Sequence, residues 1–273
     1  MHKLNIWNPI GIIVSLWRYR ELIKQFAKRD VIVRYKGSYL GMLWTFLYPL
    51  FMLMVYSFVF SVIFKSRWGT EVNNKLEFAL ILFCGLTTYN LFAECVTRAP
   101  GLILSNVNYV KKVVFPLEIL PLVVAGSALV QAVISLLILV VGLIAVMGVF
   151  HWTIVFLPLV LLPLLLLILG FGWFLSSLGV YLRDIGQVVG IVVQALMFLS
   201  PIFYPVSVIP VELRPIYYLN PMSYVVEDMR RVIIWGQMPD WKWLVIGTIA
   251  SALVAILGYV WFQKTRKGFA DVL

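Results

Sequence analysis

The sequence predicts an all-α membrane protein. We expect six transmembrane helices, an N-terminal amphipathic helix at the membrane interface, and short re-entrant helices on the outer, periplasmic side before the last span. Of the 273 residues, 62% are hydrophobic and 12% are charged, whereas soluble domains contain about 25% charged residues. The mean hydropathy is +0.98, and uncharged runs long enough to cross a hydrocarbon core of about 30 Å recur along the chain. These observations exclude an ordinary soluble fold and favour one membrane domain over residues 1–273.

The net charge of +10 comes from cations that cluster beside apolar runs. This pattern is typical of membrane topology signals and of contacts with lipid headgroups, so we do not expect a nucleic-acid partner. Cys84 and Cys95 lie about three helical turns apart, too far for a disulfide bond. His2 and His151 have no further ligands near them in the sequence, so no metal site is predicted.

The first predicted helix covers residues 16–35, where apolar residues recur near helical spacing between basic and polar ones. Such a helix lies in the membrane interface with its basic face toward lipid phosphates or solvent. Asp30 interrupts the apolar stripe, which suggests a bend at this position. The segment is either a docking or gating helix or a plain juxtamembrane anchor.

Six apolar runs are predicted to span the membrane, at residues 40–64, 78–97, 119–149, 153–180, 188–204 and 243–262. From Ile119 to Leu182 the only residue that can carry charge near neutral pH is His151, and this stretch is too long for one helix. The sequence around Gly148 therefore predicts the break of a helical hairpin. Lysine and arginine are more numerous on the side of the two termini, which predicts that both termini are cytoplasmic.

Two glycines and one proline predict irregular backbone near the first span. Gly37 and Gly41 suggest a hinge, because glycine costs a helix about 1 kcal/mol. Pro49 removes one backbone hydrogen bond and predicts a kink, which a membrane tolerates where a neighbour or water satisfies the freed carbonyl.

Aromatic side chains on both sides of Pro49 recur near helical spacing in the first span, and others occur near the fifth span. We interpret them as a path on which the faces of sugar rings stack; packing or lipid-facing aromatics are the alternative. The candidate residues are Trp44, Tyr48, Phe51, Tyr56, Phe198, Phe203 and Tyr204.

Five prolines between residues 199 and 223 exclude a long helix there. The segment is nevertheless apolar, so short half-helices that re-enter the membrane are favoured over an ordinary outer loop, at about residues 203–235. Residues 224–235 within it predict a short amphipathic helix, on which Glu227 and Arg231 have the i,i+4 spacing of an ion pair.

Motifs of catalysis are missing. The sequence has no P-loop, no H-E-x-x-H and no nucleophile elbow, so we expect neither an enzyme nor direct ATP binding. Glu94 is the only acidic candidate inside a span and lies near its end, whereas ion-coupled carriers place acids near mid-membrane. A passage opened by an outside motor is favoured.

Five stretches in series resemble one family: RDVIVRYKGSYLGMLWTFLYPLF at 29–51, NYVKKVVFPLEILP at 108–121, LGVYLRDIGQVV at 178–189, SPIFYP at 200–205 and YYLNPMSYVVEDMRR at 217–231. They are similar to the membrane subunit of ABC-2 type polysaccharide exporters, which move O-antigens, capsules or teichoic acids. The resemblance implies a homodimer in the bacterial cytoplasmic membrane, in contact with membrane lipids. It also implies two copies of a separate ATPase that binds ATP and magnesium, no cofactor in this chain, and a glycan substrate on a lipid diphosphate.

The same resemblance suggests roles for two groups of residues. A coupling segment at about 101–115 would meet the ATPase through Asn108, Tyr109, Lys111, Lys112 and Phe115. Arg29, Arg34 and Lys36 would bind the lipid diphosphate, because guanidinium groups bind phosphate bidentately; topology signals are the alternative. Two other functions stay open: an ABC-2 permease for drugs or small lipids, and a membrane-embedded glycan-modifying enzyme. The enzyme would need acidic or histidine residues facing one cavity, which the sequence alone does not assemble.

Overall fold

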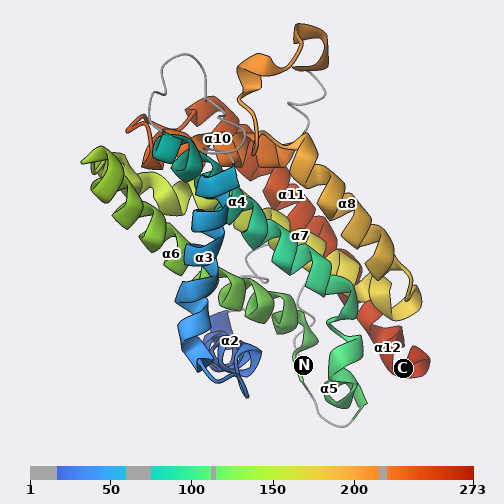
Figure 1. The fold of residues 1–273 in the computed structure, drawn as a ribbon. Coiled ribbons are helices and arrows are strands. Elements are labelled where there is room, and N and C mark those ends of the chain that lie inside the picture. The colour runs from blue at the N-terminus through green and yellow to red at the C-terminus, as the bar shows by residue number, and fades with distance from the viewer. Residues whose placement is uncertain (1–16, 60–74, 112–114, 215–219) are drawn as a thin grey trace.

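The computed structural model describes residues 17–59, 75–111, 115–214 and 220–273, and these residues form helices and turns without any strand. The predicted all-α class is therefore confirmed. Figure 1 shows one elongated helical bundle. The helices α2 (Arg20–Arg34), α5 (Val107–Lys111) and α12 (Phe269–Val272) lie at one end, and α10 (Pro221–Ile233) lies at the other.

Five helical stretches are long and apolar enough to cross a membrane, namely Gly41–Val59, Leu76–Gly101, Leu117–Met147, Trp152–Tyr181 and Trp241–Val272. They contain α3 (Trp44–Tyr56), α4 (Lys75–Arg98), α6 (Leu120–Met147), α7 (Leu157–Tyr181) and α11 (Trp241–Thr265). These match five of the six predicted spans. The last residues of the predicted first span, 60–64, lie outside the described part of the chain.

The predicted fifth span, at 188–204, differs from the structure. Helix α8 (Ile185–Leu199) has 15 residues, so it is about 22 Å long. It ends because Ser200 has extended backbone angles, φ −99° and ψ 153°, and the residue before a proline, here Pro201, is disfavoured in a helix. Six full-length spans are therefore not confirmed.

The predicted hairpin between the third and fourth spans is confirmed. Helix α6 ends at Met147, and Gly148 follows with φ +66°. A left-handed residue just after a helix is a common stop, and glycine adopts it without a Cβ clash. A short 3-10 segment, Trp152–Phe156, then leads into α7.

Helix α2 is one unbroken α-helix from Arg20 to Arg34, so the bend expected at Asp30 is wrong. The side chain of Asp30 accepts hydrogen bonds from Arg98 and Ser127 and does not compete for its own backbone. After α2, Gly37 and Gly41 both have positive φ, +88° and +51°. These two glycines turn the chain from α2 into α3; a hinge motion there stays a prediction.

The carbonyl that Pro49 leaves free in α3 has a donor on another helix. Pro49 lies inside α3 and has no N–H to donate to the carbonyl of Thr45, four residues earlier. The amide of Gln131 on α6 donates to this carbonyl at 3.0 Å, and the hydroxyl of Tyr35 donates to the Gln131 oxygen at 3.2 Å. The predicted requirement that a neighbour satisfy the freed carbonyl is therefore met by Gln131.

A fully buried arginine satisfies the backbone where α8 ends. Arg230 on α10 donates to the carbonyls of Pro201 and Ile202, the latter at 2.9 Å, and to that of Ile81 on α4 at 3.2 Å. A Cβ on Gly85 would lie 2.6 Å from the Arg230 guanidinium, so the glycine makes room for it. Buried charge is costly unless it is hydrogen-bonded, and here it links α10 to α4 and to the turn after α8.

The amphipathic helix predicted at 224–235 is confirmed as α10, but its expected Glu227–Arg231 pair is not formed. Glu227 lies 3.9 Å from Arg230, while Arg231 donates to the carbonyl of Met238 at 3.1 Å. The predicted pairing considered α10 alone, whereas the fold offers Arg231 an acceptor in the turn that follows.

Glycines also bring α7 and α11 into close contact. A Cβ on Gly258 would lie 2.2 Å from the carbonyl oxygen of Gly170, and one on Gly170 would lie 2.7 Å from that of Val254. Small residues are typical where membrane helices pack backbone to backbone. Cys84 and Cys95 are both free and buried, as their spacing predicted.

We predict that Gln131→Leu destabilises the protein by about 1–3 kcal/mol, because the Thr45 carbonyl then loses its donor. Pro49→Ala restores a backbone N–H for that carbonyl. The double variant should therefore recover most of the loss, measured by unfolding in mixed SDS micelles. If the two effects simply add, the Gln131 side chain does not serve the kink.

We also predict that Asp228→Asn changes how stability depends on pH. Asp228 is 4% exposed and accepts the backbone N–H of Asp240 at 2.9 Å. Burial raises the pKa of Asp228 from 3.8 to about 6 against the lowering effect of that hydrogen bond. Because the pKa of Asp228 is raised in the folded protein, its protonated carboxyl stabilises the fold relative to the ionised one. This stabilisation is fully present below pH 3.8 and is lost as the pH rises through about 6.

Asparagine keeps the acceptor and removes the charge. Asp228→Asn should therefore raise the stability at pH 7.5, by up to about 3 kcal/mol, and the gain should disappear at pH 4. The measurement is the midpoint of thermal unfolding in detergent at fixed scan rate, with the exposed Glu212→Gln as control. A gain that is the same at both pH values would contradict this account.

Candidate functional site

A cavity of about 470 Å³ lies between α3, α4, α6 and the end of α2. One wall is aromatic and comes from α3, with Trp44, Tyr48 and Tyr56 beside Pro49. Another wall is polar and comes from α4 and α6. Its polar residues are Thr87, Asn90, Glu94, Thr97, Gln131 and Ser135, and Arg34 and Tyr35 close the end nearest α2.

The polar wall follows from spacing along α4. Thr87, Asn90, Glu94 and Thr97 recur every three or four residues, which places them on one face of a helix. From the sequence, Glu94 was considered only as an acid near the end of a span, and the polar wall itself was missed. The helical periodicity of these four polar residues was the signal that could have identified the wall.

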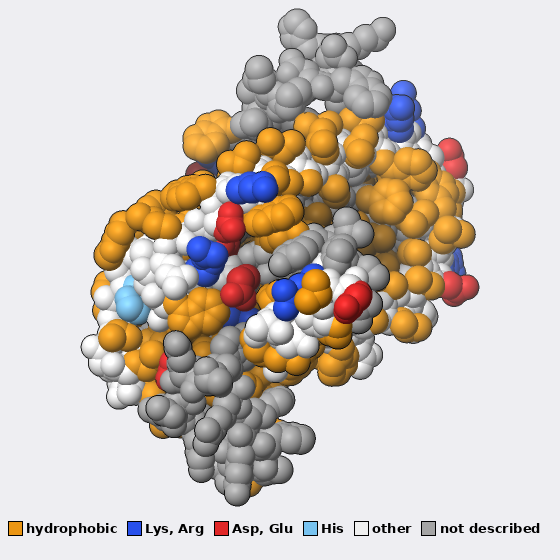
Figure 2. Space-filling view, turned by 90° about the horizontal axis from the view of Figure 1, so that it is seen from above, with side chains coloured by type: hydrophobic (Ala, Val, Ile, Leu, Met, Phe, Trp, Pro, Cys, Tyr) orange, Lys and Arg blue, Asp and Glu red, His pale blue; other side chains and the backbone are white. Residues whose placement is uncertain are grey.

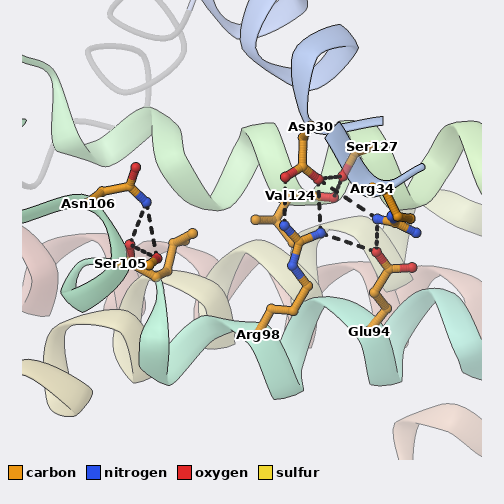
Figure 3. Close-up of polar contacts among 9 residues, drawn as sticks. Asp30, Arg34, Glu94, Arg98, Ser105, Asn106, Val124 and Ser127 are labelled. Carbon is orange, nitrogen blue, oxygen red and sulfur yellow. Dashed lines mark hydrogen bonds and ion pairs between the residues drawn. The ribbon is translucent and has the colours of Figure 1, made fainter. Parts of the chain in front are cut away.

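Four charged residues on two helices form an ion-pair cluster beside the cavity (Figure 3). Arg98 makes two contacts with Asp30, at 2.8 and 3.0 Å, and one with Glu94 at 3.3 Å. Arg34 pairs with Glu94 and lies 3.8 Å from Asp30. We call Asp30, Arg34, Glu94 and Arg98 the charge cluster. It joins α2 to α4, and Ser127 on α6 adds a hydrogen bond to Asp30 at 2.6 Å.

The charge cluster has two acids and two bases, so its charges cancel. The side chains are 25–36% exposed, and partial burial makes each ion depend on its partners. Burial alone would raise the pKa of Asp30, but the hydrogen bonds from Arg98 and Ser127 hold it below its usual value. The ionised form of Asp30 is therefore favoured in the contact that joins α2 to α4.

The three cations predicted to bind the diphosphate headgroup differ in whether they line the cavity. Arg34 lines the cavity. Arg29 and Lys36 are exposed and do not line it. Only Arg34 is therefore held in the cavity.

The seven aromatic residues of the predicted sugar path also lie in different places. Phe51 is half exposed and does not line the cavity. Phe198 and Phe203 stack on each other at 5.6 Å. Tyr204 lines a second, almost wholly apolar cavity of about 930 Å³ between α4, α7 and α8. The two cavities meet different faces of α4, so the seven aromatics do not form one continuous surface within this chain.

The predicted coupling segment folds as short helical turns, Leu104–Asn106 and α5. Asn108 and Lys111 are exposed, whereas Tyr109 stacks on Phe115 at 4.5 Å. Both rings contact Phe26 of α2, at 5.9 and 5.5 Å. Lys112 lies outside the described residues. The segment is thus connected to α2 by an aromatic contact that the sequence did not predict.

A third cavity, of about 250 Å³, gathers Glu227, Asp228 and Asp240 beside Tyr224 and Trp243 at the α10 end. Figure 2, which looks onto this end, shows charged side chains grouped between hydrophobic ones. Each acid has a structural partner: Asp240 caps α11 and donates its N–H to Asp228, and Glu227 lies near Arg230. In the described part of the chain, no group of three or more His, Cys, Asp or Glu could hold a metal ion.

We predict that Asp30 and Arg98 are energetically coupled. Asp30→Asn and Arg98→Gln should each destabilise the protein, and the double variant should lose about 1–2 kcal/mol less than the sum, because either single variant already removes the two-contact pair between these residues. A double-mutant cycle in SDS unfolding measures this. Additive effects would show that the contact does not fasten α2.

Residues 21–234 match the family model described as ABC-2 type transporter. The chain is 28% identical to the O-antigen export system permease protein RfbA of Myxococcus xanthus, over 96% of this chain and 99% of the relative. It is 25% identical to an RfbA of Klebsiella pneumoniae, with 93% and 95% covered. It is 26% identical to the polysialic acid transport protein KpsM of Escherichia coli, with 88% and 91% covered.

The predicted family is confirmed by these matches, which run through nearly the whole chain and include the segments that build the cavity. Five candidate spans agree with an integral, multi-pass membrane protein. The chain belongs to the membrane-protein family of ABC-2 type transporters.

Proposed function

We propose that this chain is the channel-forming subunit of an ATP-driven exporter that carries a lipid-linked polysaccharide across the bacterial cytoplasmic membrane. O-antigen or capsule is the substrate class that the relatives' names favour. The observation that carries the proposal is the cavity in which an aromatic wall, a polar wall and Arg34 meet.

The two walls suit a sugar chain. Aromatic faces such as those of Trp44 and Tyr48 offer apolar surfaces to the C–H faces of sugar rings, while Asn90 and Gln131 offer donors and acceptors to hydroxyl groups. The volume of about 470 Å³ lies in the usual range of ligand sites. A drug or small-lipid permease is less well supported, because a row of polar side chains inside the membrane serves an apolar ligand poorly.

The cation at the end of the cavity suits the lipid diphosphate. Arg34 offers a planar fork of donors that matches phosphate oxygens. Lys36 and Arg29, both exposed on the same end of the molecule, would add attraction for an anion that approaches along the interface. In this proposal the glycan lies along the aromatic wall with its diphosphate at Arg34.

The energy for export would come from ATP hydrolysis by a separate ATPase. The exposed Asn108 and Lys111 are available to that partner, and the contact of Tyr109 and Phe115 with Phe26 gives its movement a route to α2. Helix α8 presents an apolar outer face, with Ile191 70% and Leu199 62% exposed, which suits a second copy of the chain. We include two copies of each subunit in the proposal.

The orientation follows from charge. The basic helix α2 and the terminal helix α12 lie at one end (Figure 1), and the positive-inside rule favours the cytoplasm for that end. Helix α8 with the turn after it would then form a short sixth crossing, and the proline-rich turns before α10 would re-enter the outer leaflet.

A glycan-modifying enzyme is disfavoured, because the acidic residues that line the cavities have other roles. Glu94 is the one acid among the residues that line the 470 Å³ cavity. The acids at the α10 end serve as a helix cap and as partners of neighbouring groups. The relatives, in addition, are named as export and transport proteins.

We predict that replacing Arg34 and Lys36 with glutamine lowers export by at least about tenfold, because the diphosphate loses its charged partners. The assay is surface display of the polymer in a strain that lacks the native chain. Lys24→Gln with Lys28→Gln is the matched control: it removes two positive charges from the exposed side of α2 and leaves the cavity unchanged. Unchanged export by a normally inserted Arg34/Lys36 variant would make both residues topology signals only.

A further inference from the structure

The proposed function leaves Glu94 without a role. Glu94 lines the same cavity as Arg34, and a carboxylate on the path of an anionic headgroup should repel it. The acid is nevertheless held in the cavity by two arginines, Arg34 and Arg98. This arrangement calls for an explanation other than simple attraction of the substrate.

The two halves of the charge cluster differ in their relation to the cavity. Asp30 and Arg98 make a two-contact pair, at 2.8 and 3.0 Å, and neither residue lines the cavity. Arg34 and Glu94 pair through one nitrogen and one oxygen, and both line the cavity. The first pair is suited to holding α2 in place, and the second is accessible to a ligand.

Each member of the cavity-facing pair has a second counter-ion. Glu94 lies 3.3 Å from Arg98, and Arg34 lies 3.8 Å from Asp30. If the pair between Arg34 and Glu94 opens, Glu94 stays beside Arg98, and no buried ion is left uncompensated. Arg34 can therefore turn to another anion at a lower cost than an isolated pair would impose.

We propose that Glu94 occupies Arg34 until a lipid-linked diphosphate displaces it. This inference rests on the proposed function and adds a specificity residue to it. A diphosphate carries more negative charge than the carboxylate and accepts from both arms of the guanidinium. A membrane phospholipid with a single phosphodiester has one charge, so Glu94 excludes this abundant competitor. Such exclusion is specificity by a built-in repulsive element.

The test is equilibrium binding of geranylgeranyl diphosphate to the purified full-length chain in phosphatidylcholine nanodiscs. Glu94→Gln should bind about tenfold more tightly than the wild type, because the ligand no longer displaces an ion pair. Arg34→Gln should bind more weakly, and Glu94→Gln should give no gain in the Arg34→Gln background. Glu118→Gln is the matched control: it breaks an ion pair with Arg266 at 2.6 Å away from the cavity and should leave affinity unchanged.

A second arm tests the exclusion of phospholipid. When phosphatidylglycerol is added to the nanodiscs, the affinity of the wild type should hold, whereas the affinity of Glu94→Gln should fall. Inorganic pyrophosphate should bind more weakly than geranylgeranyl diphosphate to every variant, because the site is proposed for a lipid-linked ligand. Equal affinities for the two would overturn that assignment.

Glu94→Asp provides the test if Glu94→Gln does not fold. It keeps the charge but shortens the reach toward Arg34, so an intermediate gain is expected. If both Glu94 variants bind the diphosphate no more tightly than the wild type, the ligand does not displace Glu94. The same conclusion follows if Glu94→Gln still raises the affinity in the Arg34→Gln background. If Arg34→Gln itself leaves affinity unchanged, the diphosphate role in the proposed function fails instead, so the two failures can be told apart.

Discussion

The ion pairing between α2 and α4 is the interaction on which the candidate site depends. Asp30 and Arg98 join the basic helix α2, which also packs on α6, to α4. This contact sets the position of the last turn of α2, and therefore of Arg34. It also sets the position of Tyr35, whose hydroxyl donates to the side-chain oxygen of Gln131. The amide of Gln131 in turn donates to the Thr45 carbonyl that Pro49 leaves free in α3. Hydrogen bonds thus run from Tyr35, the residue after Arg34, through Gln131 to the helix that supplies the aromatic wall.

Irregular backbone in this bundle is stabilised by side chains from distant helices. Gln131 supplies the donor that Pro49 lacks, and Arg230 supplies donors to the carbonyls at the end of α8. In a membrane such carbonyls have no water to bond, so a protein donor is the main alternative to a regular helix. Pro49 lines one of the two large cavities and Leu199, at the end of α8, lines the other. At each of these places one long polar side chain bonds to the carbonyls that the helix leaves free.

Much of the fold could be predicted, because hydrophobic runs and helix stops are local signals. Five spans and the stop at Gly148 followed from them. The early end of α8 was missed because the apolar run continues past Ser200, although the proline that ends the helix is visible. The continuous α2 was missed because Asp30 bonds to Arg98 and Ser127, which lie far along the chain. The partner of Arg231 was missed because Met238 lies in the turn after α10, outside the helix that was considered. Of the predicted site residues, Arg34, Trp44, Tyr48 and Tyr56 line the cavity. Pairing between separate helices, such as that of Asp30 with Arg98, leaves no trace in one sequence.

The central claim is that the charge cluster holds α2 in place while Arg34 exchanges partners. The most direct measurement is a pair of cryo-EM structures of the chain with its ATPase, with and without a lipid-linked diphosphate. The account predicts that Asp30 and Arg98 keep both contacts in the two structures, and that the Arg34 guanidinium moves from Glu94 to the diphosphate inside the cavity. A diphosphate bound elsewhere, or bound at Arg34 with Glu94 still paired to it, would contradict the account.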